Sequence, residues 1–325
     1  MQSETNYTGI DISKSSFDVA TARQGKYEFN KFSNDGQGFG SLLKVLPASS
    51  HVVMEASGPY YLQLACYLAG HDIAVSVVNP LVVRRFCQMR MSRAKTDKKD
   101  AMMIAEYGKT EKPGLWQVPK QHVITLQQME ALMAGLNKER TALGNQLESF
   151  THGGMVEKQL KTMIAQELEH KDGLIKKLSK AMETLAGEHY AEMLLDLESI
   201  PGMGRKTAMA LIVLSGGFER FDDYRKLSSY IGICPRIFES GTSVKGKARI
   251  CKMGMSRVRA MLYVCSWSAK RYNKPCKELY DRLVTKGKAK KQALIAVANK
   301  LLKQAFAMAT QQTKYNENYS NIICN

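Results

Sequence analysis

The order of secondary-structure signals between Tyr7 and Gly108 limits the possible folds of this chain more than any other feature. Three short β-rich runs come first, separated by polar turns: Tyr7–Ile12, Phe17–Thr21 and Tyr27–Phe32. Helix and strand patterns then alternate: a helix over Phe39–Leu46, a strand over His51–Glu55, a helix over Tyr60–Ala69, a strand over Ile73–Val78, and helices beyond Pro80 and beyond Thr96. This order predicts an antiparallel meander extended by parallel strands with crossover helices.

An antiparallel meander followed by β–α–β crossovers is the order of a ribonuclease H-like sheet. We therefore predict an α/β domain over residues 1–118. The remaining chain predicts a mostly helical structure, divided into a helical hairpin (119–190), a further domain (191–288) and a C-terminal helix with a polar tail (289–325).

The hairpin prediction depends on apolar spacing. Between Gln121 and Leu185, apolar residues recur three, four or seven positions apart, and the pattern breaks once at Thr151–Gly154. This spacing is typical of an antiparallel coiled coil. Its role would be dimerisation or spacing, although packing on its own domain explains the same pattern. A last amphipathic helix is expected over Lys290–Met308.

The charge balance predicts a polyanionic partner. The 325 residues include 47 Lys and Arg against 30 Asp and Glu, which gives a net charge of +17. Such a bias is typical of nucleic-acid-binding proteins, although a merely soluble basic surface would also produce it. No apolar run is long enough to span a membrane, and the seven cysteines lack metal-ligand spacing. We therefore expect a cytoplasmic protein with reduced cysteines, without a membrane or a structural zinc site.

Four carboxylates occupy positions that suggest chemistry. Asp11 lies in the first strand on the face of Gly9, and Glu55 ends a later strand, where open α/β sheets usually bind ligands. Asp97 and Asp100 are three residues apart at the expected start of a helix, so both project from one face. Each acid alone has an ordinary explanation, because Asp97 could cap the helix and Glu55 could be a solvated strand end.

Together, four carboxylates in one cleft would repel one another and would require cations. Oxygen ligands suit Mg²⁺ or Mn²⁺, and a two-metal site stabilises the attacking and leaving oxygens of a phosphoryl transfer. An acid near the start of such a sheet also occurs in sugar kinases and actin-like ATPases. Those proteins need a second glycine-rich phosphate loop, and the strong basic charge of this chain is unusual for them.

Two later segments have phosphate-binding patterns. Leu197–Ala208 has the form of a helix-hairpin-helix element, in which Gly202 and Gly204 open a helix beside Arg205 and Lys206. A plain turn before a helix is the alternative.

The second segment, Ser228–Arg249, holds Ser240, Thr242 and Ser243 between glycines, followed by three cations: Lys245, Lys247 and Arg249. It is either a passive phosphate-binding loop or a loop that holds a hydroxyl nucleophile, and residue chemistry alone does not choose among the three hydroxyls.

These motifs occur in an order that resembles one protein family. The residues that carry the resemblance are Gly9–Asp11, Met54–Gly58, Lys95–Asp100, Ser199–Gly204 and Pro235–Gly241. They are similar to the insertion-sequence transposases with a RuvC-like DEDD domain, a family that includes the Piv-type DNA invertases and the bridge-RNA-guided recombinases. The similarity extends from about Tyr7 to Met308.

The resemblance implies that Asp11, Glu55, Asp97 and Asp100 bind Mg²⁺ (or Mn²⁺) in a RuvC-like domain, and that Ser240 is the nucleophile of a C-terminal transposase domain. It also implies a DNA recombinase that forms a covalent phosphoserine link, acts on donor and target DNA, and is guided by a structured RNA. The expected assembly is a homodimer or a dimer of dimers with composite sites. Thr242–Ser243 departs from the frequent Ser-Ser after the nucleophile's glycine, a small change.

Three other functions remain open from the sequence. A Piv-like invertase would share the acids and the serine without a guide RNA. A RuvC-like junction nuclease would need the acids but not Ser240. A non-catalytic nucleic-acid-binding protein would keep only the fold.

Overall fold

The computed structural model describes residues 6–23, 25–91, 96–236, 239–240, 244–245 and 249–317. The chain divides into two compact units, Met1–Val118 and Pro119–Asn325. Within the described residues, none of the helices has the length and apolar character needed to cross a membrane.

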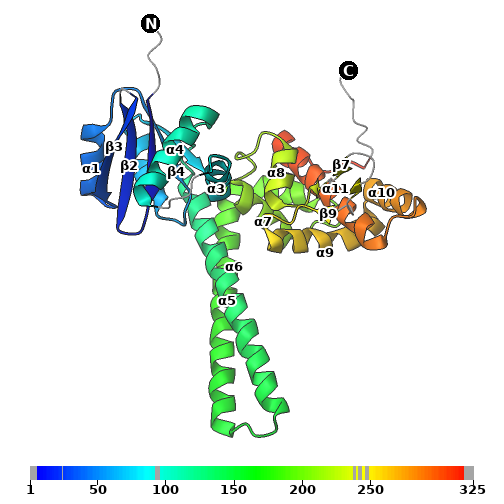
Figure 1. Ribbon diagram of the computed structural model, residues 1–325. Helices are drawn as coiled ribbons and strands as arrows, with labels where there is room; N and C mark the ends of the chain where they lie inside the picture. Colours follow the sequence, from blue (N-terminus) through cyan, green and yellow to red (C-terminus); the bar gives the residue numbers. More distant parts are fainter. Residues whose placement is uncertain are drawn as a thin grey trace. The chain divides into compact units, whose positions relative to one another are not determined.

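The N-terminal unit is built on a five-stranded mixed sheet with the strand order β3-β2-β1-β4-β5 (Figure 1, blue to cyan). The strands are β1 (Asn6–Ile12), β2 (Ser16–Arg23), β3 (Lys26–Ser33), β4 (Ser50–Glu55) and β5 (Ala74–Val78). β1 pairs antiparallel with β2 and parallel with β4, and β4 pairs parallel with β5. The predicted meander with two added parallel strands is therefore confirmed, and the arrangement is consistent with a ribonuclease H-like sheet.

Alternation along β1 divides the core of this unit into two faces. Ile10 and Ile12 pack with Phe39 and Leu64, which belong to α1 (Gly36–Val45) and α2 (Tyr61–Ala69). The other face carries Val53, which packs with residues of α3 (Pro80–Met89) and α4 (Asp97–Glu111). Because the strand period is two, Asp11 lies on the α3–α4 face.

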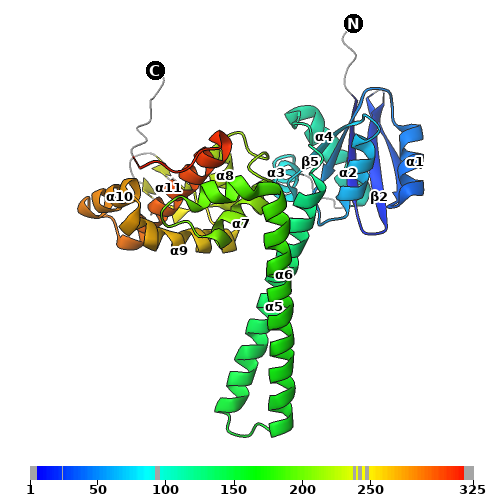
Figure 2. The ribbon, with the colours of Figure 1, turned by 180° about the vertical axis from the view of Figure 1, so that it is seen from behind.

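The C-terminal unit begins with two long helices, α5 (Gln121–His152) and α6 (Lys158–Glu198), which run side by side in Figures 1 and 2. At 1.5 Å per residue, the 32 residues of α5 extend about 48 Å and the 41 residues of α6 extend about 62 Å. α6 continues past Leu185, where the expected apolar pattern ended, and is kinked at Tyr190.

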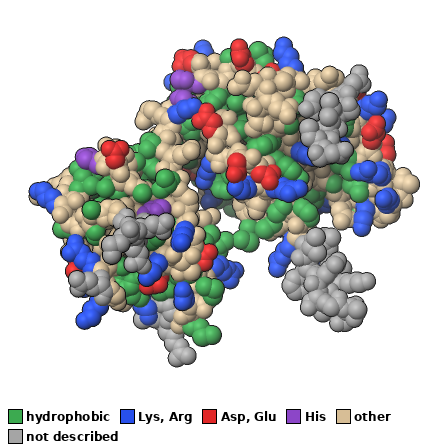
Figure 3. Space-filling model, turned by 90° about the horizontal axis from the view of Figure 1, so that it is seen from above, with side chains coloured by type: hydrophobic (Ala, Val, Ile, Leu, Met, Phe, Trp, Pro, Cys, Tyr) green, Lys and Arg blue, Asp and Glu red, His purple; other side chains and the backbone are tan. Residues whose placement is uncertain are grey.

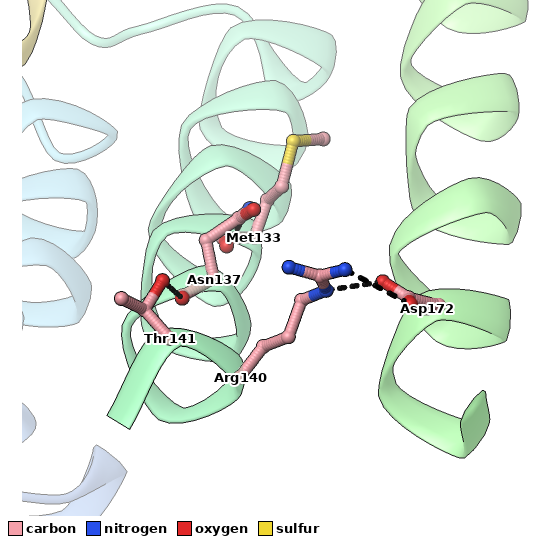
Figure 4. Close-up of polar contacts among 5 residues, drawn as sticks. All are labelled: Met133, Asn137, Arg140, Thr141 and Asp172. Carbon is pink, nitrogen blue, oxygen red and sulfur yellow. Dashed lines mark hydrogen bonds and ion pairs between the residues drawn. The ribbon is translucent and has the colours of Figure 1, made fainter. Parts of the chain in front are cut away.

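Charged pairs link α5 to α6 midway along the two helices. Arg140 donates through two nitrogens to the carboxylate of Asp172 (Figure 4), and Lys171 donates to Glu139 at 2.8 Å. Arg140, Asp172 and Glu139 are exposed, whereas Lys171 is mostly covered. Each pair therefore contributes only about 0.2–1 kcal/mol and mainly fixes the alignment of the helices.

The base of the helix pair belongs to the core of the rest of the unit. Leu126 and Ala186 are fully buried in a cluster with residues of α7 (Arg205–Ser215), α8 (Tyr224–Ile231), α9 (Ser256–Tyr272), α10 (Lys274–Thr285) and α11 (Lys290–Gln311). Two short strand pairs lie between α8 and α9: β6 (Pro235–Arg236) with β9 (Arg249–Ile250), and β7 (Glu239–Ser240) with β8 (Val244–Lys245).

Candidate functional site

A glycine in β1 sets how closely helix α4 approaches the sheet. A Cβ atom at Gly9 would lie 2.1 Å from the carbonyl oxygen of Ala101 and 2.3 Å from the amide nitrogen of Ala105. Further along α4, a Cβ at Gly108 would lie 2.7 Å from the Val53 side chain and 2.8 Å from that of Tyr7. α4 therefore runs antiparallel to β1, with its first turn near the C-terminal end of the strand.

This packing brings the first turn of α4 to Asp11. Asp97 and Asp100 occupy that turn, and Asp11 follows Gly9 by two residues on the same strand face. Thr96, not Asp97, is the N-cap, because its hydroxyl oxygen accepts a hydrogen bond from the amide of Lys99 at 3.3 Å. The helix dipole partly offsets the negative charge of the two acids.

Strand register places Glu55 beside Asp11. The parallel pairing of β1 with β4 joins Ile10 to Met54, so Asp11 and Glu55 follow at the next position of both strands. The hydroxyl of Ser57 donates a hydrogen bond of 2.6 Å to Oε1 of Glu55, which orients this carboxylate. The four acids predicted from the sequence thus come from three elements that meet at one end of the sheet.

Their proximity is visible in the electrostatics of Asp11. Burial, followed by the charges of Asp100, Glu55 and Asp97 in that order, raises the pKa of this carboxyl to about 6. The same two acids, Asp100 and Glu55, also raise the pKa of the Cys87 thiol, for which burial is the larger cause. A carboxyl that resists ionisation among other carboxylates marks a place where a cation would be stabilised.

A fifth acid, Asp18, lies directly opposite Asp11 in the antiparallel pairing of β1 with β2, and its negative charge also raises the pKa of Asp11. Asp18 is buried and pairs with Nζ of Lys31 at 3.2 Å, and Lys31 lies opposite it on β3. Neither residue was expected from the sequence. A row of charged side chains, Lys31, Asp18, Asp11 and Glu55, therefore crosses four strands on one face.

The donor chemistry of the four predicted acids fits a hard divalent cation, because all four supply carboxylate oxygens. Asp97 is exposed, whereas Asp11, Glu55 and Asp100 are half-buried, so the cluster is open to solvent on one side. Across the described residues, no three His, Cys, Asp or Glu side chains are already grouped as a metal site. The arrangement is one of neighbouring, mutually repelling acids.

The predicted helix-hairpin-helix element joins α6 to α7. Gly202 has a φ of +98° and lies against α9, where a Cβ would be 2.7 Å from the amide nitrogen of Ala269. Gly204 is the N-cap of α7, and no side chain caps this helix. Lys206 is exposed, whereas the Arg205 guanidinium is 3.2 Å from the carboxylate of Glu198.

The predicted serine loop is described only in part. The backbone of Ser240 pairs with that of Val244, and Glu239 pairs with Lys245. Arg249 is exposed on β9 opposite Arg236. Lys247, Thr242 and Ser243 lie outside the described residues.

Segments in both units match models of known protein families. Residues 8–153 match a family model for DEDD-type transposases of the IS110 kind, described as "Transposase", and residues 195–281 match the "Transposase IS116/IS110/IS902 family".

Relatives extend the match over nearly the whole chain. The chain is 32% identical to the pilin gene-inverting protein of Moraxella bovis over 96% of its own length and 98% of the relative's, with the same values for Moraxella lacunata. It is 24% identical to the transposase for insertion sequence element IS1111A of Coxiella burnetii, over 81% of this chain and 79% of that protein. The chain therefore belongs to the IS110/IS116/IS902 family of transposases and is related to the pilin gene-inverting proteins.

Proposed function

We propose that this chain cuts and rejoins DNA strands through a metal-assisted serine nucleophile. The observation that carries the proposal is the meeting of Asp11, Glu55, Asp97 and Asp100 at one end of the sheet, where their charges oppose the ionisation of Asp11. Such repulsion is relieved by divalent cations, which are the usual cofactors of phosphoryl transfer by clustered carboxylates.

In this proposal the N-terminal unit is a RuvC-like domain of ribonuclease H-like fold, and the four acids bind Mg²⁺ or Mn²⁺. When bound, the cations would supply Lewis-acid stabilisation of the attacking and leaving oxygens. The protein contributes positioning: Gly9 lets α4 approach β1, Thr96 fixes the first turn of α4, and Ser57 orients Glu55. Asp18, which forms an ion pair with Lys31, lies beside Asp11 in the same row.

The proposed nucleophile is Ser240, whose hydroxyl would lose its proton, attack a DNA phosphorus and form a phosphoserine link. The phosphorus–oxygen bond to one strand end would break, and that oxygen would take up a proton and leave as a hydroxyl. Its support is the resemblance of Glu239–Gly241 to the family motif, together with cations on the same segment, such as Arg249. The helix-hairpin-helix turn at Gly202 and Gly204 would bind a phosphate through the uncapped amide groups of α7, with Lys206 nearby. Because Arg205 pairs with Glu198, we expect it to contribute less.

An element-encoded bridge RNA would select the donor and target DNA by base pairing, while the protein would bind the nucleic-acid backbones. Lys and Arg side chains are spread over the face seen in Figure 3, with fewer Asp and Glu side chains among them, as phosphate contacts require. The alternative function is a DNA invertase without a guide RNA. The identity to the pilin gene-inverting proteins over nearly the full chain favours it.

We also propose that α5 and α6 form an antiparallel coiled coil through which the chain forms a dimer, or a dimer of dimers. Catalysis requires the nucleophile within about 3–3.5 Å of the phosphorus that the metals also hold. Exchange of units between two copies would let the acids of one protomer meet Ser240 of another.

The test combines two variants. Ser240→Ala protein should form no covalent DNA adduct, and Asp11→Asn protein should be inactive while it still binds DNA. After confirmed subunit exchange, a mixture of the two should recover part of the activity, because each mixed dimer contains one intact composite site. Without rescue, the site is built within one chain, and an adduct that persists in Ser240→Ala moves the nucleophile to another group.

RNA guidance has its own test. Protein purified from cells should carry a structured RNA, and the flanking transcript of the element should be needed for recombination. Recombination without any RNA would favour the invertase-like function.

A further inference from the structure

Helix α9 presents an aromatic side chain to solvent in the most basic part of the chain. Residues 252–291 contain twelve Lys and Arg but only two Asp and Glu, so these forty residues carry ten of the seventeen net positive charges. α9 is the yellow helix at the margin of the C-terminal unit in Figures 1 and 2. A surface of this sign fits a polyanion.

The solvent face of α9 is set by helical spacing. The exposed residues recur one, three or four positions apart, as on one side of a helix: Val264, Trp267, Ser268 and Arg271. Leu262 and its neighbours on the opposite face are buried. Val264 is 68% exposed and Trp267 is 48% exposed. Exposed aromatic and apolar side chains beside charged ones are available for contact with a partner.

The Trp267 indole is held in place by its neighbours. The Tyr263 ring meets it edge-on, with ring centroids 6.4 Å apart and an angle of 89° between the planes. Nζ of Lys270 lies 4.4 Å from the indole centroid and 5.1 Å from that of Tyr280. A pre-oriented aromatic ring with a cation against it is the arrangement on which nucleic-acid bases stack.

The helix-hairpin-helix turn packs on the opposite, buried side of the same helix. Gly202 packs on Ala269, one residue before Lys270 and two after Trp267, so close that a Cβ at Gly202 would overlap it. The uncapped N-terminus of α7 is only three residues beyond Gly202. The phosphate-binding turn and the exposed aromatic ring are therefore both fixed by α9, although they lie on different sides of it.

We propose that Trp267, with Tyr263, Lys270 and Arg271 around it, is a stacking site for a DNA strand with unpaired bases. The partner is DNA because the chain belongs to a transposase family, and the bases must be unpaired because a duplex hides their faces in its own stack. The inference rests on the proposed function, since strand exchange separates base pairs near the cut. An apolar protein partner fits less well, because cores of protein interfaces are depleted of charge.

The test uses the tryptophan content of the chain. Trp116 and Trp267 are the two tryptophans, so the Trp116→Phe protein reports on Trp267 alone. An oligothymidylate of about twenty nucleotides should quench its fluorescence strongly, and a duplex of equal length should quench it much less. Trp267→Ala in the full chain should weaken single-strand binding about 10-fold or more, whereas Trp267→Phe should retain most of the affinity.

Phe29→Ala is the matched control, because Phe29 is an aromatic residue of similar exposure in the N-terminal unit. It should leave single-strand binding unchanged. Equal quenching by the duplex, or no quenching while the strand demonstrably binds, would overturn the stacking site. Quenching by oligouridylate but not by oligothymidylate would overturn the assignment to DNA.

Failure of this site is distinguishable from failure of the proposed function. Asp11→Asn and Ser240→Ala, made in the Trp116→Phe protein, should abolish strand joining and leave the quenching intact. If quenching fails while joining still depends on these two residues, only the stacking site is wrong.

Discussion

Asp18 lies directly opposite Asp11 in the pairing of β1 with β2, and the ammonium group of Lys31 is 3.2 Å from its carboxylate. The strand that carries Asp11 therefore has acids on both sides, Asp18 on β2 and Glu55 on β4. Only the Asp18 side is neutralised by an ion pair with a basic side chain within the described residues.

Removal of this counter-charge should destabilise the metal-free protein. Lys31→Ala leaves the buried Asp18 next to Asp11 without its cation, and we expect a loss of about 1 kcal/mol in the free energy of unfolding, because Lys31 itself is half-exposed. Asp18→Asn in the same protein should restore part of the loss. Urea denaturation in EDTA measures both, with Lys26→Ala, at an exposed residue of the same strand, as control. Additive effects of the two substitutions would contradict the coupling.

Stability without metal should depend on pH through Asp11. Its folded pKa, about 6, is above the unfolded value of 3.8, so the native state binds more protons between these values. The stabilising contribution is complete below about pH 4 and is lost as the pH rises through about 6. Asp11→Asn should therefore be more stable than the wild type at pH 8, by about 1 kcal/mol after discount for partial exposure, and the difference should shrink toward pH 4.

The same comparison should reverse when Mg²⁺ is added. Mg²⁺ should raise the melting temperature of the wild-type protein at pH 8 and should have little effect on Asp11→Asn. Thermal unfolding in EDTA and in Mg²⁺ measures this difference. A variant that is stabilised by Mg²⁺ as much as the wild type would remove Asp11 from the metal-binding set.

Gly9→Ala should damage both the fold and the acid cluster. Its methyl group would overlap backbone atoms of Ala101 and Ala105, which cannot rotate away, so α4 must move off β1. We expect a loss of about 3 kcal/mol or more and a loss of stabilisation by Mg²⁺, measured by chemical denaturation. Gly40→Ala is the control, because its Cβ would be 3.8 Å from the nearest side-chain atom and should be neutral or stabilising. A Gly9→Ala protein of wild-type stability would disprove the close approach of α4.

Cys234 and Cys251 should form a disulfide under mild oxidation. Cys234 directly precedes β6 and Cys251 directly follows β9, so the two cysteines lie opposite each other at the end of this strand pair. The amide of Cys251 donates a hydrogen bond of 3.0 Å to the carbonyl oxygen of Cys234. Burial, and the nearby Cys251, raise the pKa of the Cys234 thiol, so the reaction should be faster at alkaline pH. Peptide mass spectrometry after diamide treatment should find this pair linked. Cys251→Ser should abolish the link, and a dominant bond between other cysteines would contradict the strand pairing.

Local sequence signals were enough to predict the sheet and the origin of its four acids. Apolar alternation indicates each strand. Thr96 marks the start of α4, so Asp97 and Asp100 could be assigned to one face of this helix. What brings them to Asp11 is the absence of a side chain at Gly9, a contact between residues some ninety positions apart, which no local pattern contains.

The residues that were missed depend on pairing between strands. In the sequence, Asp18 is an ordinary polar residue of the alternating run Phe17–Thr21. Its role can be recognised only from the strand register, which places it opposite Asp11 and Lys31. Trp267 was passed over for a similar reason. Trp267 follows Val264 by three residues, a helical spacing that is equally typical of a buried face. Only the packed structure shows that the buried face is the other side of α9, which carries Leu262. The role of Ser240 stays a prediction.

The division of the chain into Met1–Val118 and Pro119–Asn325 has a consequence for its synthesis. All four predicted metal-binding acids are in the first unit, which has its own core and can fold while the ribosome is still translating the second. Ser240 emerges much later. A nascent or prematurely terminated chain would therefore contain the acids without the proposed nucleophile, and on that proposal it would be unable to form a covalent link to DNA.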